Sequence, residues 1–200
     1  KDESLVQAFL KAKACDPVSS FGGIVAFNRE VDEATALELT DMFLEVIIAP
    51  GYVDKALEVL SGKSNLRVLR TPPLTGSGFR GLDFKKVVGG ALVQDRDSGI
   101  EHDFDGMKVP TKRKPTDEEL EAMKFAWTVC KHVKSNAIVF SRKDQTVGIG
   151  AGQMSRVDSV KIASMKAELP TEGSVLASEA FFLFRDGIYE VAKAGITVIV

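Results

Sequence analysis

Hydrophobic residues along this 200-residue chain recur in short runs that alternate with stretches of helical spacing. Runs such as Glu45–Ala49 and Ile196–Val200 are far shorter than a bilayer span and predict buried strands. Leu5, Phe9 and Leu10 fall on one face of a helix. Because helices alternate with strands, the pattern predicts an α/β protein in which crossover helices cover layered sheets on both faces.

The expected helices span residues 4–14, 32–43, 53–60, 116–132, 157–169 and 187–194. The expected strands span 23–28, 45–49, 66–70, two runs flanking Gly89-Gly90 between 82 and 94, 137–141, 147–150, 174–177 and 196–200. The helix over 116–132 has the clearest start signal, because Thr116 and Glu119 form a capping box ahead of a helical apolar repeat.

Residues 1–95 are expected to form a first α/β unit and residues 116–200 a second. Between them, residues 96–115 are polar, rich in Pro and Gly and without periodicity, which indicates a linker. Both halves repeat the order helix, strand, helix, strand, helix, and this suggests a duplicated unit. The chain starts without a methionine and stops inside an apolar run, so we expect a segment of a longer protein that is incomplete at both ends.

Composition narrows the function classes. The chain is 44% hydrophobic and carries 26 basic and 28 acidic residues, a net charge of -2, so no membrane span and no nucleic-acid footprint is expected. A small-molecule ligand is favoured. Cys15 and Cys130 have neither metal-ligand spacing nor a partner pattern, which suggests a reduced, cytoplasmic setting. With His102 and His132 as the two histidines, no metal site is expected.

The stretch Gly148-Ile-Gly-Ala-Gly-Gln-Met-Ser-Arg156 places three glycines in five positions between a strand and a helix start. Glycine lets a backbone approach a bound group closely, and Gln153, Ser155 and Arg156 could bind an anion or polar ring edge at the helix start. The alternative is a tight turn that only packs. The pattern matches neither a phosphate-binding loop nor a dinucleotide fingerprint.

Four further places combine polar groups with glycine or aromatic residues near the ends of elements. They are Asp16-Pro-Val-Ser-Ser-Phe-Gly-Gly23, Glu45, Lys134-Ser-Asn136 and Ser178-Glu-Ala-Phe-Phe-Leu-Phe-Arg-Asp186. Each has a plain structural alternative: a loop into a strand, a solvated carboxylate, a helix-ending turn, and phenylalanines in a core. Lys131-His132 suggests a cation and base, but a histidine there more often complements the helix terminus.

Together these segments resemble the 5-aminoimidazole-4-carboxamide ribonucleotide (AICAR) transformylase region of the bifunctional purine biosynthesis family. The matching motifs keep the family's order and cover almost the whole chain: Asp16-Pro-Val-Ser-Ser-Phe-Gly-Gly-Ile-Val-Ala-Phe-Asn28, Ile47-Ile-Ala-Pro-Gly-Tyr52, Lys134-Ser-Asn-Ala-Ile-Val139, Gly148–Arg156 and Ala180-Phe-Phe-Leu-Phe-Arg-Asp186. The resemblance implies a duplicated cytidine-deaminase-like α/β fold without a catalytic metal. It also implies a homodimer with active sites at the subunit interface.

The activity implied is formyl transfer from 10-formyltetrahydrofolate, the co-substrate, to the amine of the AICAR nucleotide. Carried over by motif, nucleotide contacts fall on Gly22, Glu45, Asn136, Arg156 and Phe181, with Asn136 orienting the substrate. Folate contacts fall on Val157 and Asp186, with Phe184 beside the pterin.

The family's catalytic Lys-His pair is expected upstream of Lys1, so this segment alone should be inactive; an accompanying IMP cyclohydrolase domain would also lie outside it. In some branches, the family has Asp at the position where this chain has Glu45. The family usually has Asp at the position of Glu179 and Pro at the position of Leu183. Two alternatives stay open: a catalytically silent nucleotide-binding module, and a structural α/β dimerisation domain.

Overall fold

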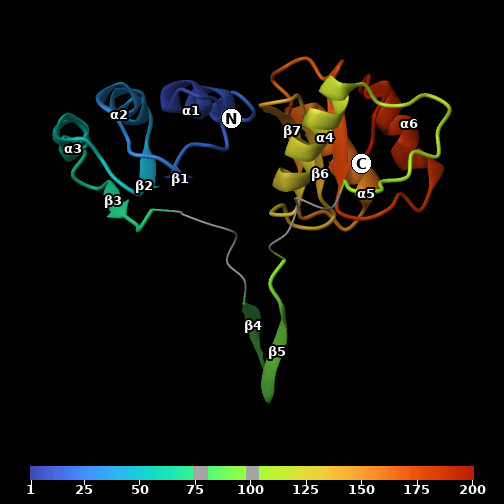
Figure 1. The fold of residues 1–200 in the computed structure, drawn as a ribbon, viewed down its shortest axis with the longest axis horizontal. Helices are drawn as coiled ribbons and strands as arrows, with labels where there is room; N and C mark the ends of the chain where they lie inside the picture. The colour runs from blue at the N-terminus through green and yellow to red at the C-terminus, as the bar shows by residue number, and fades with distance from the viewer. Residues whose placement is uncertain (74–80, 98–103) are drawn as a thin grey trace. The chain divides into compact units, whose positions relative to one another are not determined.

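A computed structural model of the chain describes residues 1–73, 81–97 and 104–200 (Figure 1). The chain divides into two compact units, one made of Lys1–Pro73 with Pro115–Val200 and the other of Leu74–Lys114. Residues 82–95, expected within the first α/β unit, therefore group with the smaller unit. His102 and part of the expected linker, residues 98–103, lie outside the described residues.

The amino-terminal part of the larger unit carries a three-stranded parallel sheet in the order β1-β2-β3. The elements follow as α1 (Leu5–Lys13), β1 (Gly23–Ala26), α2 (Glu33–Thr40), β2 (Leu44–Ala49), α3 (Asp54–Ser61) and β3 (Arg67–Arg70). Asp32 caps α2 by accepting a hydrogen bond of 2.8 Å from the Thr35 amide, which explains why this helix begins where the sequence indicates.

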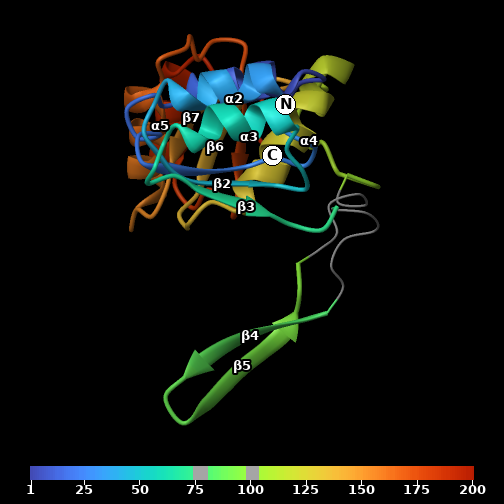
Figure 2. The ribbon, with the colours of Figure 1, turned by 90° about the vertical axis from the view of Figure 1, so that its left-hand side faces the viewer.

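All three of these helices pack on one face of the parallel sheet. Their apolar side chains form one core with Val25, Ile47 and Val68, which are paired neighbours across the three strands, and Figure 2 shows α2 and α3 above β2 and β3. Ile24 and Leu69, on the opposite face, are exposed. Within the described residues, the expected cover on both faces is therefore wrong for this sheet.

The smaller unit contains a two-stranded antiparallel hairpin, β4 (Leu82–Val87) and β5 (Gly90–Asp95). The turn uses Gly89, whose φ of 83° suits glycine. This agrees with the two runs expected on either side of Gly89-Gly90. Every residue of both strands is exposed.

The carboxyl-terminal part of the larger unit carries an antiparallel sheet in the order β7-β6-β8. Its elements are α4 (Asp117–Cys130), β6 (Ile138–Ser141), β7 (Thr146–Gly150), α5 (Arg156–Lys166), β8 (Val175–Ser178) and α6 (Arg185–Lys193). The Thr116–Glu119 capping box is present at the start of α4. The sequence did not predict that this sheet is antiparallel while the first is parallel.

Helices cover both faces of this second sheet, as expected. Ile138 and Phe140 pack with α5 and α6 in one core. On the other face, Ser141 donates to the Ala122 carbonyl of α4 and Cys130 of α4 approaches the Ala177 carbonyl. The chain is thus α/β, whereas the duplicated cytidine-deaminase-like arrangement stays a prediction.

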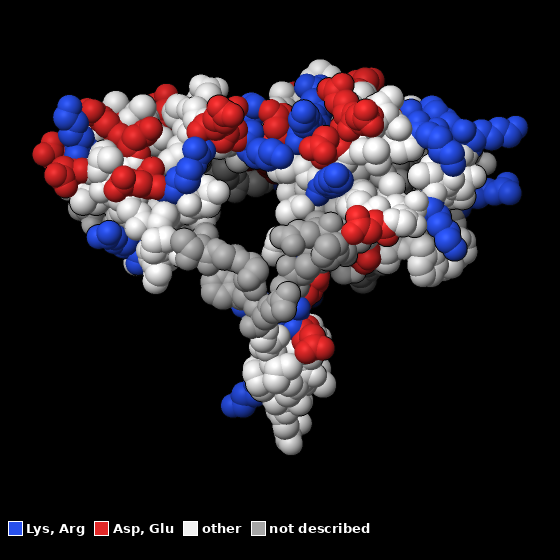
Figure 3. Space-filling model, in the orientation of Figure 1, with Lys and Arg blue, Asp and Glu red and all other residues white. Residues whose placement is uncertain are grey.

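The expected strand at 196–200 forms only a bridge, in which Ile199 pairs parallel to Leu176 of β8. Backbone bonds of 2.9 Å join Leu176 to Val198 and Ser178 to Val200. None of the described helices has both the length and the apolar character needed to cross a membrane. Both acidic and basic side chains are visible on the face seen in Figure 3.

Candidate functional site

A hollow of about 460 Å³ lies in the carboxyl-terminal part of the larger unit, where the starts of α5, α6 and β6 meet the end of β8. Its lining combines an amide, a guanidinium, a carboxylate and aromatic rings: Asn136, Met154–Val157, Ala180–Phe184, Asp186 and Gly187. Few convergent polar groups among apolar walls are typical of a small-molecule site.

The glycines of β7 are packing residues. A Cβ on Gly148 would lie 2.2 Å from the Ala163 carbonyl oxygen of α5, and one on Gly150 would lie 1.9 Å from that of Ser159. These two glycines therefore allow the backbone of α5 to pack closely against β7. Gly152, with a φ of 70°, makes the turn toward that helix, so the packing alternative is the correct one for Gly148 and Gly150.

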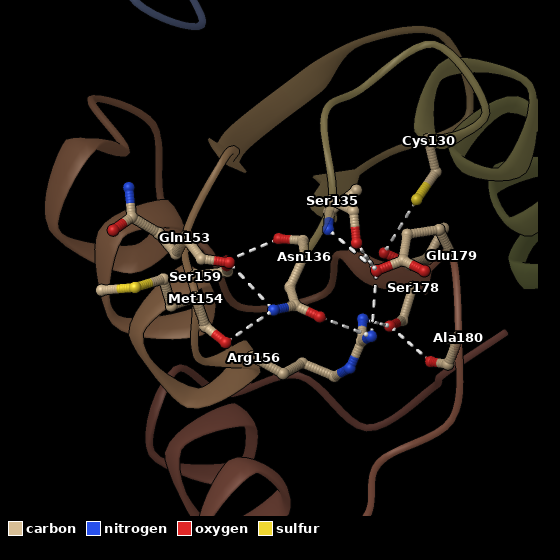
Figure 4. Close-up of polar contacts among 12 residues, drawn as sticks. Cys130, Ser135, Asn136, Gln153, Met154, Arg156, Ser159, Ser178, Glu179 and Ala180 are labelled. Atoms are coloured by element: carbon tan, nitrogen blue, oxygen red, sulfur yellow. Dashed lines mark hydrogen bonds and ion pairs between the residues drawn. The ribbon is translucent and has the colours of Figure 1, made fainter. Parts of the chain in front are cut away.

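Asn136 is held by the residues that follow the Gly152 turn. Its Nδ2 donates to the backbone carbonyls of Gln153 and Met154, at 2.9 and 3.0 Å (Figure 4). Only the amino end of the side chain can donate to two carbonyls, so the amide orientation is fixed. Its Oδ1 accepts a hydrogen bond of 3.0 Å from Arg156; a carbonyl oxygen has two lone pairs, and among the described residues the second is open to a ligand N–H.

Arg156, the first residue of α5, ties several segments together. Nη1 donates to Ser178 Oγ at 2.7 Å, and Nη2 donates to Asn136 and to Glu179 Oε1 at 2.9 Å. Its guanidinium carbon also lies 6.0 Å from the centre of the Phe182 ring. With its side chain only 15% exposed, Arg156 presents a fixed fork.

Glu179 balances that positive charge. Partial burial would raise the pKa of its carboxyl, but hydrogen bonds from Arg156 and Ser135, the Arg156 charge and the Ala137 amide outweigh burial and lower the pKa below its usual value. The Glu179 carboxyl is therefore ionised at neutral pH, and it pairs with Arg156 where both are partly withdrawn from water.

The aromatic residues divide into two kinds. Phe182 is partly buried and packs against the core of the second sheet, which is the structural alternative considered for it. Phe181 and Phe184 are 78% and 70% exposed beside the hollow. Exposed rings at the rim of a hollow can stack on a flat heterocycle.

Two helices begin at the hollow. The residues before them, Ser155 and Phe184, make no side-chain capping bond to α5 or α6. Free N–H groups at helix starts favour polar oxygen atoms of a ligand. Asp186 accepts a bond of 2.7 Å from the Gly187 amide within α6.

The structure brings most of the expected site residues together and leaves two apart. Six of the eight line the hollow: Asn136, Arg156, Val157, Phe181, Phe184 and Asp186. Gly22 lies instead directly before β1, and Glu45 lies within β2. Gly22 donates to the Phe43 carbonyl, and Glu45 forms an exposed ion pair of 2.7 Å with Arg67.

Lys131 and His132 lie at the carboxyl end of α4 and do not line the hollow. Sequence reasoning missed the roles of Ser135, Ser178 and Glu179 in fixing Asn136 and Arg156. A signal existed, because Ser178 ends a buried strand and Glu179 directly follows it. Among the described residues, no three His, Cys, Asp or Glu side chains gather as a metal site would require.

The chain is thus an α/β protein in which a fixed amide and guanidinium line one hollow together with exposed aromatic rings. Comparison with known sequences places it further. A family model described as "AICARFT/IMPCHase bienzyme" matches residues 1–166, and the chain belongs to this family.

Similar proteins carry a consistent description. The chain is 54% identical over 201 residues to a "Bifunctional purine biosynthesis protein PurH" of Anaeromyxobacter sp. (strain Fw109-5), which covers 97% of the chain. It is likewise 54% identical to a protein so described from Aquifex aeolicus (strain VF5), and 53% identical to one from Sorangium cellulosum (strain So ce56), each covering 98% of the chain. In all three, the chain spans 38% of the relative's length.

Proposed function

We propose that this chain is the ligand-binding part of a formyltransferase of purine biosynthesis. In the reaction, the amine of the AICAR nucleotide attacks the formyl carbon of 10-formyltetrahydrofolate. A nitrogen–carbon bond forms, the bond from that carbon to folate N10 breaks, and a proton moves from the amine to N10 by way of a base.

The observation that carries the proposal is the convergence of an amide, a guanidinium and two exposed phenylalanines on one hollow. A nucleotide base with a carboxamide and an amine needs in-plane hydrogen bonds and a stacking surface. The free lone pair of Asn136 Oδ1 suits an N–H of that substrate, and Arg156 suits an oxygen. Val157, Phe184 and Asp186 line the same hollow and suit the folate.

The aromatic amine is a poor nucleophile because its electrons are delocalised, so the reaction needs orientation as well as a base and a cation. In this proposal the hollow supplies orientation. The base and cation come from a Lys-His pair outside this chain, and Lys131 and His132 take no part.

The proposal also includes a homodimer. Gly22, directly before β1, and Glu45, within β2, would contribute to a nucleotide site completed by a second copy of the chain. A site shared by two subunits would account for expected nucleotide contacts that fall in both halves of the chain.

Titration calorimetry on the longer protein that contains this chain tests the proposal with AICAR nucleotide and a non-reactive folate analogue. Arg156→Gln should weaken nucleotide binding about 10- to 100-fold, because it removes charge-assisted hydrogen bonds. Asp186→Asn should weaken the folate analogue and leave the nucleotide unchanged. Arg142→Gln is the matched control, because Arg142 donates to the Pro170 carbonyl away from the hollow.

Each outcome has a clear meaning. If the folded Arg156→Gln variant binds nucleotide as tightly as the control, the hollow is not the nucleotide site. If the parental protein binds nucleotide but forms no formylated product from both substrates, the silent-module alternative is correct. If it binds neither ligand, the structural dimerisation alternative is correct.

A further inference from the structure

One oxygen of Glu179 joins three separate segments of the site. Its Oε1 accepts from Ser135 Oγ at 3.0 Å, from the Ala137 amide at 3.2 Å and from Arg156 Nη2 at 2.9 Å (Figure 4). These donors come from the approach to β6 and from the first residue of α5, whereas Glu179 itself follows β8.

The first consequence concerns the residue between two of those donors. Ser135 and Ala137 flank Asn136, so Glu179 binds the Ser135 side chain on one side of it and the Ala137 backbone amide on the other. Ser159 Oγ adds a bond of 2.6 Å to the Asn136 carbonyl. The Asn136 amide therefore projects from a backbone that cannot turn without breaking bonds to Glu179.

The second consequence concerns Arg156. Its Nη2 serves Asn136 and Glu179 together, while Nη1 is engaged by Ser178. A guanidinium that is 15% exposed is costly to leave unpaired, and ionised Glu179 supplies the compensating charge. Arg156 is also the one cationic side chain among the described residues that line the hollow.

We propose that Glu179 is the positioning residue of this site: it locks the Asn136 amide and the Arg156 fork in one geometry and cancels the arginine charge. The positioning role rests on the function proposed above in one respect, the ligand group that the site recognises. That group is a neutral carboxamide rather than a phosphate. Asp186 adds a further negative charge at the hollow, so a free phosphate dianion meets no unbalanced cation there.

The test compares wild type with Glu179→Gln and Glu179→Asp in the longer protein that contains this chain. Glutamine keeps the size and one acceptor oxygen but removes the charge, whereas aspartate keeps the charge. We expect Glu179→Gln to lower kcat for formyl transfer about 10- to 100-fold, since misplacing a positioning group by about an ångström costs this much. Nucleotide affinity should also fall, but by less than in Arg156→Gln, because Asn136 and Arg156 are still present and only lose their fixed geometry.

Two readouts do not depend on that activity. Arginine-selective NMR should show a slowly rotating Arg156 guanidinium in wild type and a freely rotating one in Glu179→Gln. Titration with inorganic phosphate should shift the Arg156 signals in Glu179→Gln and leave them unmoved in wild type. Glu179→Asp should restore the wild-type behaviour in both, wholly or in part.

The outcomes separate this inference from the proposed function. A wild type that binds neither substrate overturns the proposed function, while the NMR and phosphate results still decide the role of Glu179. A Glu179→Gln variant with unchanged Arg156 signals and no response to phosphate overturns the positioning role. Equal loss of activity and stability in both variants, without rescue by aspartate, shows a merely structural residue and also overturns it.

Discussion

The amide oxygen of Asn136 accepts a hydrogen bond of 3.0 Å from Nη2 of Arg156, across 20 residues of sequence. The same asparagine donates from Nδ2 to the carbonyls of Gln153 and Met154. Asn136 is therefore tied at both ends of its amide to the segment that begins α5. This closed arrangement keeps the strand end and the helix start in register at the hollow.

Asn136→Asp should destabilise the protein by about 2–4 kcal/mol. The substitution replaces two donated bonds with carboxylate oxygens that face carbonyl oxygens, and each lost bond is worth about 1 kcal/mol before repulsion is added. Urea unfolding measures the change. Asn65→Asp, at an exposed position, is the control and should change stability by less than about 0.5 kcal/mol; equal effects of the two substitutions would contradict the bonding described.

Gly150→Ala should cost about 1–3 kcal/mol or more, because the added Cβ would lie 1.9 Å from the Ser159 carbonyl oxygen. The neighbour is backbone, so α5 has to move to make room. Gly90→Ala makes the same chemical change where a Cβ would meet nothing within 4 Å, and it should be tolerated. Thermal unfolding of both variants checks the difference, and a Gly150→Ala protein as stable as Gly90→Ala would refute the close approach.

Cys130 should resist thiol reagents in the folded protein. Burial and the nearby Glu179 carboxylate raise the pKa of its thiol to about 11, and Arg156 offsets only part of that rise. The reactive thiolate is therefore scarce at pH 8. Burial also raises the pKa of Cys15, so labelling by a disulfide reagent should be slow for both thiols until denaturant is added, and rapid labelling of native Cys130 would show that its surroundings are open.

Acid should remove the stability that Glu179 provides. The pKa of its carboxyl is lower in the folded state than the ordinary value of 4.5, so the unfolded state binds more protons and stability falls as the pH drops. The contribution is complete above pH 4.5 and is lost as the pH falls through the folded value.

Urea unfolding at several pH values measures this effect as the difference in stability between wild type and Glu179→Gln. That difference should shrink below pH 4.5, whereas a constant difference would show that Glu179 does not titrate as described. Asp32→Asn provides a comparison at a helix cap, where the pKa is lowered by bonds to Thr35, away from the hollow.

Much of the secondary structure follows from local patterning. The helix expected over 116–132 is observed as α4, Asp117–Cys130, because Thr116 and Glu119 form their capping box. The strands around Ile47 and Val139 follow from short apolar runs. The helix expected over 32–43 ends earlier, at Thr40, and Phe43 is left exposed.

The direction of pairing could not be predicted from those patterns. Fully buried strands look alike whether their neighbours are parallel or antiparallel, and the second sheet is antiparallel while the first is parallel. The bridge at Ile199 shows the same limit, since apolar content does not specify how many ladder bonds form.

The individual residues of the site were more predictable from the sequence than the hydrogen bonds that join them. Asn136, Arg156 and Phe181 stand out by residue type and by their place at element ends, and they do line one hollow. Glu179 does not stand out, because its role depends on three donors from distant segments. The glycines of β7 stand out in the sequence but pack against a helix. A glycine that lets a helix approach closely and one that lets a ligand approach closely look the same in sequence.

The contact of Gly148 and Gly150 with α5 also limits how this site can vary. Any larger side chain at either glycine would push α5 off β7 and carry Arg156 away from Asn136. Substitutions in the middle of a buried strand are thereby coupled to the position of Arg156, so the packing of β7 against α5 also sets the geometry of the hollow.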